Sequence, residues 1–132
     1  MYPCKLLIID DDKDDVELLS DALLQAGSSS FHCVKSALEA LSFLDECATV
    51  QALPRLIVTD LYLPAINGIQ LIKTLQQTDR YRNIPVFVLS TLRYDMVTDF
   101  HKNLAASGYI KKPTCYQDYL KVAAFLNHKS AA

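Results

Sequence analysis

The sequence contains no long hydrophobic run, no cluster of basic residues and little glycine or proline. Its longest apolar stretch is far shorter than the roughly 18 to 20 residues needed to cross a bilayer, so we expect no membrane insertion. The 13 Lys and Arg residues are scattered along a chain of net charge −2. Direct nucleic-acid binding is therefore not expected, because it requires basic residues gathered on one surface.

Closely spaced cysteines are also missing: Cys4, Cys33, Cys47 and Cys115 lie far apart. This spacing favours reduced thiols over a disulfide framework or a zinc site. With no signal-peptide pattern at the N-terminus, it predicts a cytoplasmic protein. The length of 132 residues, with 3 glycines and 5 prolines, predicts a single domain over residues 1–132 without an output domain.

Short apolar runs recur about every 25 residues and predict five β-strands. The runs cover residues 5–9, 31–34, 56–59, 86–89 and 109–110. Most of them are apolar throughout rather than alternating with polar residues, which is typical of parallel strands covered on both faces.

Helical patterns follow each predicted strand. They cover approximately residues 16–26, 37–48, 67–77, 95–106 and 116–127. Five strands that alternate with five helices, in a chain too short for an eight-unit barrel, predict an α/β fold with an open, doubly wound parallel sheet.

Polar residues gather where the predicted strands end. These residues are Asp10, Asp11 and Asp12 after the first strand, Asp60 after the third, Ser90 and Thr91 after the fourth, and Lys111 and Lys112 after the fifth. Ligands of open α/β sheets bind outside the carboxyl ends of the strands. The sequence therefore predicts one shared site at this edge.

Several aspartates in one site repel each other unless a cation lies among them. Hard oxygen ligands, without a nearby imidazole or thiolate, favour Mg²⁺ over zinc. We therefore expect Mg²⁺ as the cofactor.

Four motifs then occur in order along nearly the whole chain. They are Leu-Ile-Ile-Asp-Asp-Asp at residues 7–12, Ile-Val-Thr-Asp-Leu-Tyr-Leu-Pro at 57–64 followed by Gly68, Val-Leu-Ser-Thr at 88–91, and Gly-Tyr-Ile-Lys-Lys-Pro at 108–113. In this combination the chain resembles the CheY-like response-regulator receiver domain. The resemblance implies a flavodoxin-like (βα)5 fold with strand order 2-1-3-4-5, acting in two-component phosphorelay signalling.

The resemblance also implies roles for the acidic residues. Asp60 is expected to be the nucleophile that accepts a phosphoryl group, giving an aspartyl phosphate. Asp11 is expected to bind Mg²⁺ directly and Asp10 mainly through water. Asp60 itself and the backbone carbonyl of Tyr62 complete the implied metal ligands.

Three further residues receive roles by the same resemblance. Lys112 and Ser90 are expected to contact phosphoryl oxygens, and Ser90 and Tyr109 are expected to change position as the switch. The implied partners are a sensor histidine kinase or a histidine phosphotransfer protein, together with an unidentified effector protein. The domain is expected to catalyse only its own phosphorylation and dephosphorylation, not to act as an enzyme on other substrates.

Asp14 and Asp15 are interpreted as solvated carboxylates that complement the dipole of a helix N-terminus. The segment from Asp10 to Asp21 resembles an EF-hand loop only in part, because Asp15 occupies the position that requires glycine and the preceding residues form a strand.

Two other function classes remain as alternatives. One is a pseudo-receiver, which keeps the fold as an interaction module but does not use phosphate. The other is a small phosphohydrolase of the haloacid dehalogenase type, which also uses an aspartate nucleophile with Mg²⁺. Residues 10–14 match the motif of that family only partly, and the chain lacks room for its larger core and cap.

Overall fold

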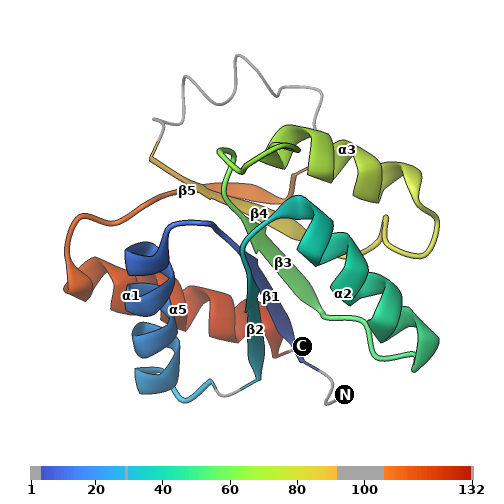
Figure 1. The fold of residues 1–132 in the computed structure, drawn as a ribbon. Helices are drawn as coiled ribbons and strands as arrows, with labels where there is room; N and C mark the ends of the chain where they lie inside the picture. Colours follow the sequence, from blue (N-terminus) through green and yellow to red (C-terminus); the bar gives the residue numbers. More distant parts are fainter. Residues whose placement is uncertain (1–3, 29, 92–105, 132) are drawn as a thin grey trace.

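The computed structural model describes residues 4–28, 30–91 and 106–131 (Figure 1). The strands are β1 (Leu6–Ile9), β2 (Phe31–Val34), β3 (Leu56–Thr59), β4 (Val86–Ser90) and β5 (Gly108–Lys111). The helices within the described ranges are α1 (Lys13–Gln25), α2 (Ala37–Thr49), α3 (Gly68–Gln77) and α5 (Tyr116–Ser130).

All strand pairs are parallel, and the sheet order is β2-β1-β3-β4-β5. The expected doubly wound sheet and its strand order are confirmed. The predicted strand at residues 109–110 is longer by one residue at each end, and the last helix continues to Ser130. The helix predicted at about 95–106 falls almost wholly on residues 92–105, which lie outside the described ranges.

The sheet separates two apolar cores, because successive side chains of a strand point to opposite faces. Leu7 and Ile9 of β1 pack with α2 and α3, whereas Leu6 and Ile8 pack with α1 and α5. Figure 1 shows α1 and α5 side by side on one face of the sheet and α2 and α3 on the other. Covering both faces explains why the strand sequences are apolar throughout.

Side-chain caps fix where three of the helices begin. Asp12 accepts a hydrogen bond from the backbone N–H of Asp15 at the start of α1, and Ser36 caps α2 in the same way. Asn67 forms a reciprocal capping box with Gln70 at the start of α3. Two of these capped starts, those of α1 and α3, lie directly after the segments that carry Asp10 and Asp60.

The described residues contain all four cysteines, without a disulfide, and no helix suited to crossing a membrane. Cys47 is buried, Cys4 and Cys33 are partly buried, and Cys115 is exposed. Across residues 4–28, 30–91 and 106–131, no helix combines the length and apolar character needed to span a bilayer.

Candidate functional site

The candidate site lies at the carboxyl edge of the sheet, between two central strands. Asp10 follows β1 and Asp60 follows β3, and these strands are neighbours in the sheet. The backbone N–H of Asp60 donates to the carbonyl of Ile9 at 3.0 Å, so the hydrogen bonding between β1 and β3 continues into the site. From β1 the chain crosses toward β2, and from β3 it crosses toward β4, which makes this edge the topological switch point of the sheet.

Lys112 joins the carboxylates of three separate segments. Its Nζ lies 2.8 Å from Asp10 Oδ2, 2.7 Å from Asp15 Oδ2 and 2.9 Å from Asp60 Oδ2. The lysine follows the edge strand β5, and its backbone N–H donates to the carbonyl of Ser90 at 2.7 Å. Its side chain therefore reaches past β4 to the ends of β1 and β3.

Because the charged side chains of Asp10, Asp60 and Lys112 are buried, they interact strongly with one another. Asp10, Asp60 and Lys112 are each at most 7% exposed. Burial raises the pKa of Asp10, although hydrogen bonding to Lys112 opposes that rise. Burial alone would lower the pKa of Lys112, but hydrogen bonds to the carboxylates outweigh it and raise that pKa above its ordinary value. The surrounding carboxylates thus favour the ammonium form of Lys112.

A group of oxygen donors lies beside the lysine. Carboxylate oxygens of Asp10, Asp11 and Asp60 lie within 4.8 Å of one another, with Asp11 exposed and the other two buried. Backbone N–H groups orient two of these carboxylates: that of Asp12 donates to Asp10 at 3.0 Å, and that of Tyr62 donates to Asp60 at 3.3 Å. Three converging carboxylates of this kind suit a small, hard divalent cation.

The remaining expected site residues lie around this centre. Ser90 is buried at the end of β4, and Thr91 beside it is exposed. Tyr109 lies in β5 and packs against the core that α2 and α3 cover. Tyr62, two residues after Asp60, is 59% exposed.

Asp15 corrects the interpretation of the N-terminal acids. Asp14 is exposed, as expected for a solvated helix start. Asp15 is not solvated in this way, because it pairs with Lys112 and also accepts a hydrogen bond from the hydroxyl of Tyr119 on α5 at 3.3 Å. Burial, followed by the charge of Asp15, raises the pKa of Tyr119 to about 12. No local signal in the sequence marks Asp15, because its two partners follow it by 97 and 104 residues.

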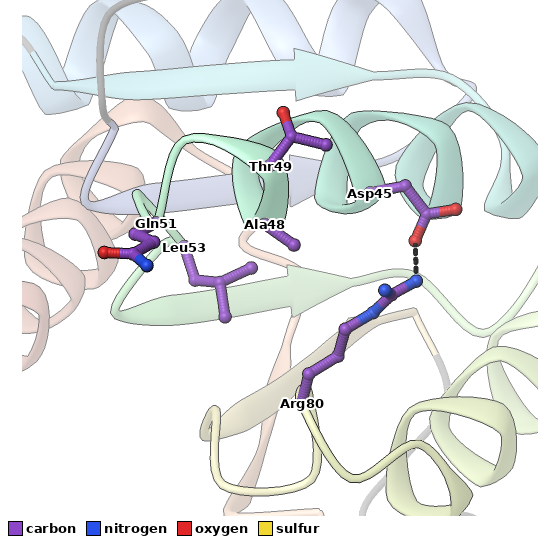
Figure 2. Close-up of a pocket in the computed structure, with 6 residues that line it drawn as sticks. All are labelled: Asp45, Ala48, Thr49, Gln51, Leu53 and Arg80. Atoms are coloured by element: carbon purple, nitrogen blue, oxygen red, sulfur yellow. Dashed lines mark hydrogen bonds and ion pairs between the residues drawn. The ribbon is translucent and has the colours of Figure 1, made fainter.

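A separate surface pocket of about 620 Å³ lies at the opposite end of the sheet (Figure 2). Its walls come from the end of α2, the segment that leads into β3, and Arg80. Asp45 and Arg80 form an ion pair of 2.7 Å across one side of it. The acid of this pocket is thus already neutralised by a base, and the converging carboxylates lie at the carboxyl edge instead.

Comparison with known proteins agrees with this arrangement. The family model described as the response regulator receiver domain matches residues 6–124. The chain belongs to this family. Receiver domains are signalling domains of two-component response regulators, which fits a doubly wound sheet with an acidic cluster and a lysine at its carboxyl edge.

Individual relatives differ in length. The transcriptional regulatory protein CpxR homolog of Haemophilus influenzae is 32% identical over 109 residues, 83% of this chain but 44% of that protein. The polar-differentiation response regulator DivK of Brucella anthropi is 26% identical over 111 residues, 84% of this chain and 85% of DivK. This receiver domain thus spans less than half of the first relative and most of the second.

A solved structure shows the same fold. The phosphorylated cyanobacterial phytochrome response regulator RcpA superimposes with a TM-score of 0.81 at 24% identity, covering 96% of this chain and 93% of that one.

Proposed function

We propose that this receiver domain accepts a phosphoryl group on Asp60 from a phosphohistidine of a sensor histidine kinase or phosphotransfer protein. An oxygen of the Asp60 carboxylate attacks phosphorus, the P–O bond forms, and the P–N bond to the imidazole breaks. The observation that carries the proposal is the buried Lys112 ammonium 2.9 Å from Asp60. It places a positive charge where phosphoryl oxygens would lie.

Asp10, Asp11 and Asp60 are the residues that would hold Mg²⁺, together with the backbone carbonyl of Tyr62. Bound there, Mg²⁺ would supply positive charge that offsets the repulsion between an anionic carboxylate and an anionic phosphoryl group. The protein contributes orientation: N–H groups and Lys112 hold the Asp10 and Asp60 carboxylates in place.

Ser90 and Tyr109 would link the phosphoryl group to the surface. The Ser90 hydroxyl would donate to a phosphoryl oxygen, and Tyr109 would turn inward as the end of β4 closes on the site. The changed surface would then be read by an effector protein, so the domain signals through protein–protein contact.

The test is phosphorylation by acetyl phosphate with Mg²⁺, followed by intact mass spectrometry. Wild-type protein should gain one labile phosphoryl group and Asp60→Asn should gain none. Asp21→Asn is the matched control. It removes an exposed acid of α1 that lies outside the site, so this variant should be labelled normally. An unlabelled wild type would favour a pseudo-receiver, and turnover of unrelated phosphomonoesters would favour a phosphohydrolase.

A further inference from the structure

Asp15 is an acid of the site that the receiver motifs do not account for. It lies in the first turn of α1, and its side chain is 27% exposed. Its Oδ2 is 2.7 Å from Lys112 Nζ, a separation as short as those from Asp10 and Asp60. Lys112 is therefore shared between the proposed phosphoacceptor and a residue on a helix.

The Asp15 carboxylate is held from two sides. Oδ2 accepts from Lys112, while Oδ1 accepts from the hydroxyl of Tyr119, a buried residue of α5 in the core that α1 and α5 share. The backbone N–H of Asp15 is fixed as well, because it donates to the capping carboxylate of Asp12 at 3.1 Å. These contacts hold the Asp15 carboxylate in one position, unlike a mobile surface side chain.

Lys112 has no spare donor for a phosphoryl group. An ammonium group carries three N–H donors, and three carboxylates surround this one. A phosphoryl oxygen that bonds to Lys112 must therefore take the place of a carboxylate oxygen. Asp10 would serve as a ligand of the proposed metal, and Asp60 would itself carry the phosphoryl group. Asp15 is therefore the competitor for Lys112.

The excess of negative charge in the site also makes Asp15 oppose binding of a phosphoryl group. Asp10, Asp11, Asp15 and Asp60 bring four carboxylates to one ammonium. Phosphorylation replaces the single charge of Asp60 by a group of roughly −1.5 to −2. The Asp15 carboxylate lies on the same nitrogen as Asp60, so it repels this added charge at short range.

We propose that Asp15 is a positioning residue that holds the Lys112 ammonium in the unphosphorylated protein and competes with the phosphoryl group for it. Asp15 thereby lowers the affinity of the site for a phosphoryl group while strengthening its affinity for a divalent cation. The inference rests on the proposed function. Release of Lys112 leaves Asp15 bonded to Tyr119 alone, so phosphorylation breaks the contact between α1 and the residue that follows β5.

The experiment measures two affinities in Asp15→Asn by NMR titration: that for Mg²⁺ alone, and that for beryllofluoride, a phosphoryl mimic, at saturating Mg²⁺. Removing the negative charge of Asp15, a few ångströms from the phosphoryl site, should strengthen beryllofluoride binding about tenfold. This value allows for the partial exposure of Asp15. The same change should weaken Mg²⁺ binding severalfold. A variant that merely loosened the structure would weaken both, so the opposite signs identify the electrostatic role.

Two further variants complete the design. Asp14→Asn makes the same charge change one residue away at an exposed position and should shift each affinity less than about twofold. Tyr119→Phe keeps the Asp15 charge but removes the hydrogen bond that orients it. It should strengthen beryllofluoride binding by about two- to threefold, and it tests the inference even if Asp15→Asn folds poorly.

Each remaining result decides against the inference. Unchanged or weaker beryllofluoride binding in Asp15→Asn, with wild type binding normally, overturns it and leaves the proposed function standing. An equal shift in Asp14→Asn overturns it as a general charge effect. Absence of beryllofluoride binding in the wild type overturns the proposed function and the inference together.

Discussion

Gly68 is the position where one added methyl group should disturb both stability and the site. It is the first residue of α3, and a Cβ atom there would lie 2.2 Å from the carbonyl oxygen of Asp60 and 2.9 Å from the Cα of Leu61. Ordinary contacts begin at 3.4 Å, so helix and loop would have to separate by more than about 1 Å. Both contacted atoms are backbone and cannot rotate away.

The magnitude for Gly68→Ala follows from three contributions. Overpacking against backbone costs about 1–3 kcal/mol. Stretching the 2.9 Å bond from the Gly68 N–H to the Leu61 carbonyl costs about 1 kcal/mol more. Alanine returns up to about 1 kcal/mol through its helix propensity. The free energy of unfolding should therefore fall by about 1–3 kcal/mol.

Urea unfolding monitored by circular dichroism measures this change, and phosphorylation by acetyl phosphate should slow because the Asp60 backbone moves. Gly27→Ala is the control: Gly27 has φ +88° with open space around it, so that variant should lose about 1 kcal/mol from backbone strain alone and keep normal phosphorylation. A Gly68→Ala protein within about 0.5 kcal/mol of wild type would refute the steric reasoning.

Two other predictions concern the free energy of unfolding. Ala65 has φ +64°, so Ala65→Gly should raise the free energy of unfolding by about 0.5–1 kcal/mol in urea titrations, whereas Ala48→Gly inside α2 should lower it by about 1 kcal/mol. Burial, then the hydrogen bond to Asp45, raises the pKa of Tyr81 to about 12. Because the folded state holds this proton more tightly than an unfolded chain with pKa near 10, the stability from Tyr81 is intact below about pH 10 and is lost as pH rises toward 12. Urea midpoints at about pH 9 and about pH 11.5 should show a loss of about 2 kcal/mol that Tyr81→Phe lacks, and equal losses in both proteins would contradict this account.

The strand ends were predictable because two simple patterns coincide there. Apolar runs marked the strands, and Asp60 and Lys112 followed them directly, so the edge of a parallel sheet had to bring these residues together. The boundaries of β5 were less accurate. Its residues are only partly buried at the sheet edge, and its two end residues, Gly108 and Lys111, are of types that are uncommon in strands.

Asp15 shows where reasoning from local sequence fails. A carboxylate in the first turn of a helix is usually explained by the helix dipole, and nothing near Asp15 in the chain contradicts that explanation. Its actual partners, Lys112 and Tyr119, follow it by 97 and 104 residues. Such contacts depend on how α1 packs against α5 and on the reach of one lysine side chain, which no local pattern contains.

The long reach of Lys112 also has a consequence for the order of folding. Its partners Asp15 and Asp60 precede it by 97 and 52 residues, and it enters from the edge strand β5. A chain in which β5 and α5 have not docked holds the acids together without their ammonium, so mutual repulsion opposes closure of that edge. Docking of the C-terminal segment removes this repulsion at three carboxylates in one step. Contacts so distant in sequence carry a loop-closure cost, and the site is complete only when the C-terminal segment has docked.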